Sequence, residues 1–498
     1  MRRALLALAV AAGGFLGAVG LAGAGTVAPL SLVSGPSPFA SCTIGGPGTN
    51  YVNAEVEPWV DVNPADPTNI IGVFQQDRWS NGGAHGLVAG VSHDGGVSWS
   101  RSWAHFSLCS GGTAANGGDY ERASDPWVSF GLSGTAYQVA ISFDQTTFRN
   151  GVLVSRSTTE GNTWDEPISL IRDTDGNVFN DKESVTADPA NASLAYAVWD
   201  RLVFPTSERA NVIAGFVTSA FRGPVWFSRT TNGGNSWEAA RQIFDPGQEN
   251  QTIGNEIVVL PNGTLVDGFD EFHAAQNAKK LRGFSVRIIR SADKGLTWSR
   301  SILVDRLETI GVTDPETGDP VRTGDIIPEF AVDPTSGNLY AVWQDARFSG
   351  FQYDSIAFSR STDGGLTWSA PLMVNKTPTN IASGNQQAFT ASVHVSADGT
   401  VGVTYYDFRN NTSDPTTLLT DYFIVECHGG CTNAANWSEE KISPASFDMR
   451  TAPFAGGFFV GDYEGLASIG TDFVPFFVQA NSGDTANRTD AFATRVTP

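Results

Sequence analysis

The 498-residue sequence predicts an all-β fold built from about seven similar four-stranded units. Three observations support this fold class. An eight-residue motif recurs along the chain, short apolar stretches alternate with turns rich in Pro, Gly and Asn, and aromatic residues are frequent, with 13 Trp and 31 Phe. Motifs that return at a long spacing are typical of repeat folds, in which each repeat is one supersecondary unit.

The motif reads Ser-x-Asp-x-Gly-x-Thr-Trp and is clearest at residues 361–368. Two further copies are close and two are altered: residues 92–99, 291–298, 157–164 and 230–237. Thr159 and Asn232 replace the Asp in the altered copies. An Asp can accept backbone N–H bonds, the glycines allow positive φ, and the Trp can cover the turn. We therefore expect a tight hairpin turn with a structural role.

This motif resembles the Asp-box, or BNR repeat, of the sialidase (neuraminidase) superfamily, and the resemblance covers the chain from about Val56 to the C-terminus. It implies a sialidase-like β-propeller of four-stranded blades. It is weaker evidence for activity, because Asp-box propellers include other glycosidases and proteins without catalysis. Sialidases usually have six blades, and six is the alternative to the seven units counted here.

The units can be followed in order. The first contains strands at residues 59–62, 70–74 and 87–91, then the motif, then a strand from Ser98. The first strands of the other units are expected to begin near Pro126, Ser184, Ile257, Phe330, Phe389 and Gly465. The seventh unit has three strands, and a strand of the N-terminal segment near Tyr51 would complete it and close the ring.

The N-terminus predicts an exported protein. Residues 1–24 read as a signal peptide, with Arg2 and Arg3, an apolar run and the cleavage motif Ala22-Gly23-Ala24. Residues 25–50 are expected to form a linker or N-terminal segment, and residues 51–498 the propeller. No other stretch reaches about 18 consecutive apolar residues, so we expect a secreted, extracellular monomer without a membrane span.

Charge and cysteine content narrow the functional classes. The formal net charge of −21 excludes nucleic-acid binding through a general basic field. Four cysteines in an exported chain are expected to pair, Cys427 with Cys431 and Cys42 with Cys109. A metal site that includes His428 is the alternative for the first pair, but zinc would need further ligands. No cofactor is expected, and a structural Ca²⁺ among the acidic residues is left open.

In such a fold, the motif turns lie on one face, and the starts of first strands with the ends of second strands lie on the other. Long insertions at residues 203–223, 306–325 and 411–421 could form lids or walls. An Asp that ends the second strand in most units is expected to be structural. Residues found in one unit are better functional candidates: Arg122, Lys182, His273 and the run 461–465.

The resemblance also implies site residues, because sialidases use three arginines, a Tyr nucleophile assisted by a Glu, and an Asp acid/base. The catalytic candidates are Tyr463 as nucleophile, Glu464 or Glu329 as its activator, and Asp77 as acid/base. The substrate-binding candidates are Arg78, Arg201, Arg347, Arg409 and Arg122. The sequence departs from the family where the F/Y-R-I-P motif is absent and Glu57-Pro58-Trp59 takes its place.

These observations predict a secreted sialidase-like glycoside hydrolase that acts on extracellular glycans. A Tyr nucleophile suits an acidic sugar, because a neutral phenol avoids the repulsion that a carboxylate would meet. The alternatives are a non-catalytic propeller that binds glycans or proteins at the cell surface, and a polysaccharide lyase with a Tyr or His base.

Overall fold

The structure, a computed structural model, describes residues 25–204, 222–273 and 283–498. The predicted signal peptide and most of the 203–223 insertion lie outside these residues. Within the described ranges the chain is almost entirely β-structure, and its helical elements are short 3-10 helices: η1 (Arg347–Ser349), η2 (Ser383–Gln386), η3 (Ala434–Asn436) and η4 (Met449–Thr451). The all-β prediction is confirmed there, and no helix in these ranges has the length and apolarity that a membrane crossing requires.

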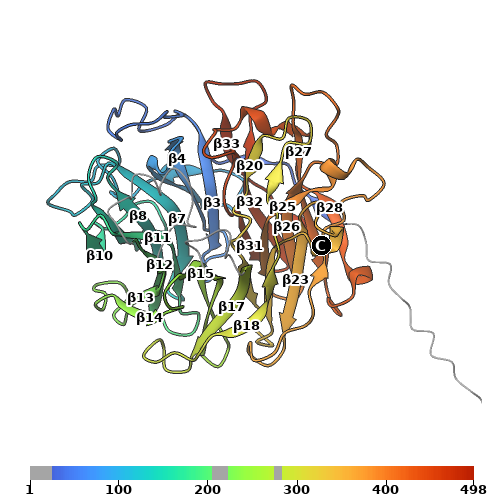
Figure 1. The fold of residues 1–498 in the computed structure, drawn as a ribbon. Helices are drawn as coiled ribbons and strands as arrows, with labels where there is room; N and C mark the ends of the chain where they lie inside the picture. The colour runs from blue at the N-terminus through green and yellow to red at the C-terminus, as the bar shows by residue number, and fades with distance from the viewer. Residues whose placement is uncertain (1–24, 205–221, 274–282) are drawn as a thin grey trace, which may run out of the picture.

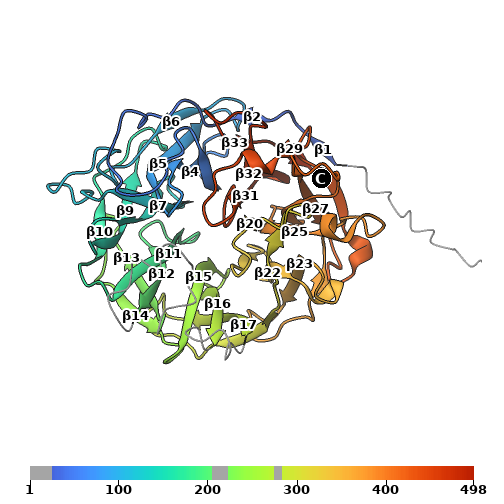
Figure 2. The ribbon, with the colours of Figure 1, turned by 45° about the horizontal axis from the view of Figure 1, so that its top comes forward.

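Antiparallel sheets follow one another along the chain and stand side by side around a common centre (Figures 1 and 2). The first set of strands is β3 (Glu55–Val62), β4 (Ile70–Arg78), β5 (Ala84–Ser92) and β6 (Ser100–Ser102). The second is β7 (Arg122–Phe130), β8 (Ala136–Phe143), β9 (Asn150–Ser157) and β10 (Ile168–Asp173). One residue pair, Ala84 with Ala123, links these two sets into one eight-stranded sheet.

Four further sets repeat the order first, second, third and fourth strand. Two of them are β11 (Val178–Ala187), β12 (Ala195–Val203), β13 (Val225–Thr230), β14 (Arg241–Phe244), and β15 (Asn250–Val259), β16 (Leu265–His273), β17 (Gly283–Ser291), β18 (Ile302–Leu307). The next is β21 (Glu329–Val332), β22 (Leu339–Asp345), β23 (Ser355–Ser361) and β24 (Leu372–Met373). The last is β25 (Ala388–Val395), β26 (Val401–Asp407), β27 (Leu419–Cys427) and β28 (Ser438–Lys441), with β29 (Phe447–Asp448) paired to β27.

The final sheet combines both ends of the described chain. Its strands are β31 (Gly465–Ile469), β32 (Asp472–Ala480), β33 (Thr489–Ala493), β34 (Val496–Thr497), β1 (Thr26–Val27) and β2 (Ser31–Leu32). Strand β2 pairs with β33 and β1 pairs with β34. The N-terminal segment therefore does supply an outer strand to the last unit, but from residues 31–32 and not from the neighbourhood of Tyr51.

The first strands face the common centre and contact one another in succession: β3, β7, β11, β15, β21, β25 and β31, with β31 returning to β3 (Figure 2). Apolar clusters fill the spaces between neighbouring sheets. Contact there is close. A Cβ atom at Gly268 of β16 would lie 2.2 Å from the ring of Phe330 on β21, so a glycine is needed at that position.

A bulge interrupts most of the first strands and explains why several begin earlier than the sequence predicts. The residue pairing shifts after Val56, Ser124, Asp181, Ile253 and Phe389. The residue that follows each shift point has a left-handed backbone: Glu57, Asp125, Lys182, Gly254 and Thr390, with φ between 49° and 73°. A bulge breaks the two-residue alternation, so the apolar pattern becomes readable only after it.

The repeated motif forms the turn between the third and fourth strands of a sheet, as predicted. In the copy at residues 361–368, Asp363 accepts bonds from the backbone amides of Leu366 and Thr367, both at 2.9 Å, and from the Thr367 hydroxyl at 2.6 Å. The Trp368 indole donates to the Gly365 carbonyl at 3.2 Å. The motif therefore closes its turn with its own side chains.

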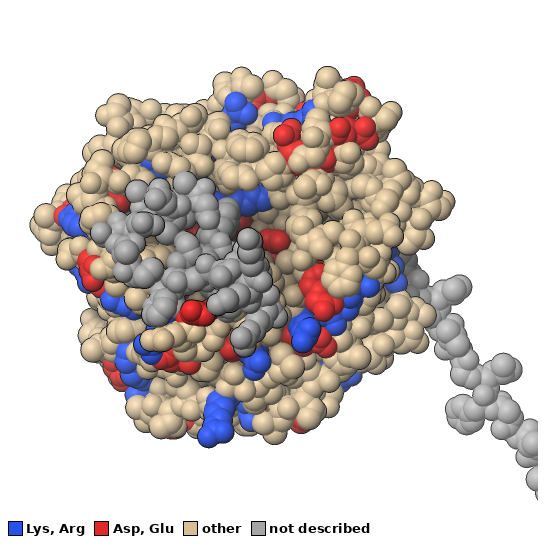
Figure 3. All heavy atoms as spheres, in the orientation of Figure 1, with Lys and Arg blue, Asp and Glu red and all other residues tan. Residues whose placement is uncertain are grey.

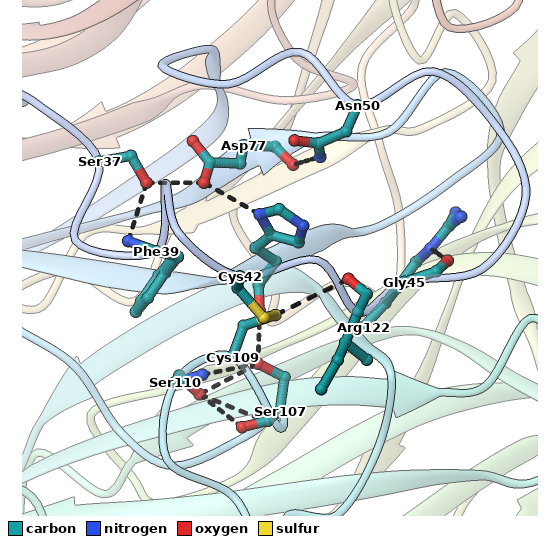
Figure 4. Close-up of a disulfide and its surroundings, with 12 residues drawn as sticks. Ser37, Phe39, Cys42, Gly45, Asn50, Asp77, Ser107, Cys109, Ser110 and Arg122 are labelled. Carbon is teal, nitrogen blue, oxygen red and sulfur yellow. Dashed lines mark hydrogen bonds and ion pairs between the residues drawn. A yellow bond between two sulfur atoms is a disulfide. The ribbon is translucent and has the colours of Figure 1, made fainter.

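Both predicted disulfides are formed, Cys42 with Cys109 and Cys427 with Cys431. The first bond holds the N-terminal segment against the loop that follows β6 (Figure 4).

Candidate functional site

A cavity of about 410 Å³ lies between the first strands and the segment around residues 310–327. Its wall is largely apolar and includes Ile141, Phe143, Phe179, Leu202, Ile253 and Val321. Charged side chains also line it: Arg78, Asp125, Asp181, Lys182, Arg322, Asp325 and Asp462. Clefts that combine an apolar wall with a few convergent polar groups are the usual form of a small-molecule site.

The bulges bring two of these side chains to the cavity. Asp125 on β7 and Lys182 on β11 both have a φ of 52°. The Asp125 carboxylate accepts bonds from the Ser124 hydroxyl at 3.0 Å and from the Lys182 amide at 3.3 Å. A left-handed backbone is costly for residues other than glycine, so this geometry is held by its surroundings.

The insertion before the fifth unit forms another wall of the cavity. Its strands β19 (Val312–Thr313) and β20 (Pro320–Arg322) make a hairpin, and β20 pairs in parallel with β30 (Phe458–Phe459). This pairing brings Arg322 to Asp462, where its guanidinium donates to both carboxylate oxygens, one of them at 2.9 Å. A lid or wall function was predicted for this insertion, and its hairpin lines the cavity.

The carboxyl groups of the cavity differ in protonation behaviour. Burial raises the pKa of Asp181 well above its ordinary value, and the neighbouring charges of Asp125 and Asp200 raise it further. Burial would also raise the pKa of Asp462, but the charge and hydrogen bonds of Arg322 lower it below the usual value. One cavity thus contains a carboxyl that favours the protonated form and another that favours the ionised form.

A smaller, deep pocket of about 10 Å³ is lined mostly by buried residues and shares Lys182 with the cavity. Glu183, Glu256 and Glu329 line it, and burial raises the pKa of each of them, that of Glu256 to about 8. The predicted activator Glu329 therefore lies in this deep pocket and not in the larger cavity.

Tyr463 and Glu464 are both buried, and neither lines the larger cavity. The Tyr463 hydroxyl donates to the carbonyl of Pro126 at 3.3 Å, and its ring packs against Trp59 and Trp127. Glu464 accepts a bond from the amide of Val478 at 3.1 Å. The two side chains thus make separate contacts, and burial raises the pKa of the Tyr463 phenol well above its ordinary value. Their catalytic roles remain predictions.

Asp77 lies outside the cavity, in the region that anchors the N-terminal segment (Figure 4). Its carboxylate accepts bonds from the Ser37 hydroxyl at 2.6 Å and the Asn53 amide at 2.8 Å, and it contacts His85 Nδ1 at 3.1 Å. These contacts give Asp77 a clear structural role, which is the role that was expected for the Asp residues that end second strands.

The five arginine candidates are not brought together. Arg78 lines the cavity, where its guanidinium donates to Gln75 at 2.7 Å and lies 3.8 Å from Glu57. Arg122 is buried among backbone carbonyls of the N-terminal segment, donating to Gly45 at 2.7 Å and Pro47 at 2.8 Å (Figure 4).

The other three arginines form ion pairs away from the cavity. Arg201 binds Asp173 with two bonds of 2.6 and 2.7 Å. Arg347 binds Asp345 at 2.8 Å and Asp305 at 3.0 Å, and Arg409 binds Asp407 at 2.7 Å and Glu439 at 2.6 Å. Arg78 is thus the one member of the predicted anion-binding set that lines the described cavity.

Sequence reasoning did not single out Arg322, Asp181 or Asp325. Arg322 and Asp325 belong to the insertion at residues 306–325, whose unusual length was the available signal. Asp181 directly precedes Lys182, which was singled out because it occurs in one unit. A bulge that disturbs the alternation at residues 181–184 conceals the direction of the Asp181 side chain from any sequence pattern.

Two further observations concern ions and surface charge. Within the described ranges, no group of three or more His, Cys, Asp or Glu side chains is arranged to hold a metal ion. Acidic and basic side chains are interspersed over the face of the molecule drawn in Figure 3.

No protein-family model matches the sequence, and neither does any curated protein sequence. Several solved structures resemble it at low identity. A Hadza microbial sialidase has a TM-score of 0.46 and 15% identity, covering 86% of this chain and 73% of that chain. An α-L-arabinanase of Penicillium chrysogenum has a TM-score of 0.45 and 12% identity, and the match covers 94% of this chain and 98% of that chain. A leech intramolecular trans-sialidase has a TM-score of 0.46 and 11% identity, and the match covers 95% of this chain and 98% of that chain. All these scores lie below 0.5, so the topology and the cavity carry the functional argument.

Proposed function

We propose that this protein is an exported glycoside hydrolase whose active site is the 410 Å³ cavity. The observation that carries the proposal is the presence of Asp181 and Asp462 in one cavity with pKa values shifted in opposite directions. Hydrolysis of a glycosidic bond commonly uses one protonated and one ionised carboxyl group. Groups whose environments separate their pKa values in this way are natural acid and base partners.

In this mechanism, Asp181 is the general acid and protonates the leaving oxygen of the scissile bond. Asp462 remains ionised and stabilises the positive charge that develops on the sugar ring, or activates the attacking water. The bidentate contact with Arg322 fixes the orientation of Asp462 and keeps it ionised. We propose these two carboxyls in place of Asp77 and the buried Tyr463.

The scaffold in this proposal is a seven-bladed β-propeller. The succession of contacts among the first strands supports it, as does the pairing of residues 26–32 with residues 492–497. Export is supported by the two disulfides and by the signal-like sequence at residues 1–24. The substrate is an extracellular glycan, and the cationic side chains in the cavity favour one with an acidic sugar.

A second candidate function is glycan binding without catalysis. The internal pairing of Arg322 with Asp462 favours it, because this contact already satisfies two charged groups of the cavity. In that case the cavity would bind a sugar and leave its glycosidic bond intact.

The test is hydrolysis of a panel of chromogenic acidic and neutral glycosides by the purified mature protein. Asp181→Asn should lower kcat/KM by at least about 10²-fold on the substrate that is cleaved, because the general acid is lost. Asp305→Asn is the matched control, since Asp305 pairs with Arg347 outside the cavity. Asp305→Asn also removes one carboxylate, so its melting temperature measures the cost of that change to stability, while its kcat/KM should stay at the wild-type value.

The products distinguish the two roles of Asp462. Proton NMR of the first anomer released shows whether configuration is retained or inverted. Retention indicates that Asp462 faces the sugar ring and stabilises its positive charge, and inversion indicates that Asp462 activates the attacking water as a general base. If the panel gives binding but no turnover, the hydrolase proposal fails and the binding function replaces it.

A further inference from the structure

Both ends of the insertion at residues 306–325 meet near one buried carboxyl group, that of Asp354 just before β23. At the first end, the Thr309 hydroxyl and the Ile310 amide bond to Asp354 at 2.5 and 3.0 Å. At the other end, Asp325 Oδ2 lies 3.0 Å from the same Thr309 hydroxyl oxygen. We call Asp325, Thr309 and Asp354 the carboxyl bridge. It closes the base of the insertion whose hairpin lines the cavity.

The carboxyl bridge needs a proton from one of its two carboxyl groups. A threonine hydroxyl has one hydrogen, so it can donate to Asp325 or to Asp354 but not to both. The Thr309 oxygen also accepts the amide of Gly311 at 3.0 Å. The second carboxyl contact is therefore a hydrogen bond only if that carboxyl is protonated and donates to the hydroxyl oxygen. Without this proton, two anionic carboxylates would face a single hydroxyl hydrogen.

The surroundings of Asp354 hold its side chain in place. Asp354 is fully buried, and Gln344 Nε2 donates to its Oδ2 at 3.2 Å. The direction of the Gln344 amide is set because its oxygen accepts the Thr390 amide at 3.0 Å. Asp325, by contrast, lines the cavity. Loss of the shared proton should therefore move Asp325 and its end of the insertion, and should leave Asp354 where it is.

The carboxyl bridge acts on the cavity through the hairpin. Arg322 lies three residues before Asp325 and binds both carboxylate oxygens of Asp462. Gly324 packs against the backbone at Asp462, where an added Cβ would lie 2.1 Å from the carbonyl oxygen. A shift of Asp325 would therefore loosen the contact that orients Asp462.

We propose that the carboxyl bridge is a proton-operated clamp, which holds the hairpin against the cavity while a proton is shared and releases it as the pH rises. This inference rests on the assignment of the cavity as the functional site. It makes Thr309 and Asp354 positioning residues for Asp462. In the released state both carboxyls of the bridge are ionised and repel each other.

Burial and nearby charges set the pH at which the clamp opens. Burial raises the pKa of Asp354 to about 6, and the charge of Asp325 adds to this effect. Burial also raises the pKa of Asp325, as does the charge of Asp462. The charged groups around the bridge are Asp270 on β16, the Arg322–Asp462 pair, and Glu308, Arg347 and Asp345 beside Thr309. Two carboxyls that share a proton titrate as a pair, so the clamp is lost as the pH rises through about 6.

The first test is thermal unfolding of the mature protein from about pH 5 to 8. Asp325→Asn keeps a donor for the Thr309 oxygen but cannot ionise. A carboxyl whose pKa is raised in the folded state contributes stability below its ordinary pKa near 4, and this contribution is lost as the pH rises through the folded value. The melting temperature of Asp325→Asn should therefore increase relative to that of wild type as the pH rises.

Asp319→Asn is the matched control for this test. Asp319 belongs to the same insertion and accepts a threonine hydroxyl, that of Thr317 at 2.9 Å, but it has no second carboxyl across that hydroxyl. The difference in melting temperature between Asp319→Asn and wild type should stay constant over the same pH range.

The second test follows the hairpin directly, by hydrogen–deuterium exchange and mass spectrometry without ligand. After correction for the intrinsic effect of pH on exchange, the protection of residues 309–324 in wild type should fall about tenfold from about pH 5 to 8, the scale of one hydrogen bond. Asp325→Asn should keep its protection, and Thr309→Val should lack it already at the lower pH. Thr309→Ser retains the hydroxyl and should behave as wild type. Should Thr309→Val fail to fold, Asp325→Asn and Thr309→Ser carry the test.

Three results overturn the inference. One is protection of the hairpin that does not depend on pH in wild type, and another is an Asp325→Asn variant that loses stability relative to wild type as the pH rises. The third concerns a cation, which could hold two ionised carboxyls together without a proton. A melting temperature that rises with added Ca²⁺ in wild type but not in Asp354→Asn would show this arrangement.

Neither readout depends on turnover. A hairpin that is released with rising pH, in a protein that cleaves no glycoside, supports the inference and contradicts the hydrolase proposal. Cleavage of glycosides by a protein whose hairpin protection is independent of pH does the reverse.

Discussion

Replacement of Asp363 by alanine should destabilise the protein without changing its activity. The carboxylate accepts two backbone amides and the hydroxyls of Thr367 and Ser361, at 2.6–2.9 Å. The turn is exposed, so each lost bond contributes at the low end of the usual range, and the total loss should be about 1–2 kcal/mol. In a chain of this size, that corresponds to a fall in melting temperature of about 1–2 °C.

The chain contains its own comparison for this variant. In the altered copy at residues 230–237, Asn232 accepts the Ser236 amide at 3.0 Å and donates to the Ser236 hydroxyl at 2.8 Å. An amide thus keeps part of the bonding that the carboxylate provides. Asp363→Asn should therefore lose about half as much stability as Asp363→Ala.

The assay is thermal unfolding followed by circular dichroism, with turnover measured on the same samples. Leu366→Ala is the control, because the Leu366 side chain is exposed and its amide stays in place. The reasoning is refuted if a folded Asp363 variant loses turnover, or if the asparagine variant is as unstable as the alanine variant.

The pH dependence gives a further check on Asp363. Burial raises the pKa of Asp363, but the hydrogen bonds from Thr367, Ser361 and Leu366 together outweigh burial and lower the pKa to about 2. A depressed pKa means that the ionised carboxylate stabilises the fold at all pH values above its ordinary pKa near 4. This contribution is lost as the pH falls through about 2, so the difference between wild type and Asp363→Ala should shrink over that window.

Three other predictions concern the hairpin, a buried ion pair and the disulfides. Gly324→Ala should destabilise the protein more than Gly318→Ala and should weaken ligand binding. A Cβ at Gly324 would lie 2.1 Å from the Asp462 carbonyl oxygen, whereas a Cβ at Gly318 would face open space; equal melting temperatures of the two variants would contradict this. Arg409→Met should cost about 3 kcal/mol by leaving Asp407 and Glu439 unpaired, with kcat unchanged in the folded enzyme. Removing the Cys42–Cys109 bond, which spans 67 residues, should cost about 4 kcal/mol in denaturant unfolding against about 2 kcal/mol for Cys427–Cys431, which spans 4; the reverse order would be inconsistent with the loop-entropy argument.

Much of the fold could be predicted because its signals are local. Second strands such as β8 and β26 end where the sequence indicated, since an apolar run stops at Asp144 or Asp407. The turns between the third and fourth strands are encoded by the eight consecutive residues of the motif. The first strands were less predictable, because their bulges depend on how β7 and β11 meet their neighbours.

The site was less predictable for a related reason. Arg347 and Arg409 each follow an Asp by two residues, and in the fold each binds that Asp. Repetition across units therefore indicated a structural ion pair and not a substrate clamp. Arg322 contacts Asp462, 140 residues away, through a hairpin with no periodic pattern. Contacts of this kind depend on the assembled ring and have no counterpart in a local sequence signal.

The pairing of β1 with β34 and of β2 with β33 separates the order of synthesis from the order in space. Strands β1 and β2 are synthesised first, but they can pair only after β33 and β34 have been synthesised. Until β2 pairs with β33, β33 presents an unpaired edge that can associate with other chains. Because both ends of the described chain lie in the same sheet, the ends could be joined and the chain opened at another position. A circular permutant that joins the present ends through a short Gly/Ser linker and opens at the exposed turn around Asp363 would keep every sheet, and its seam would lie inside a different one.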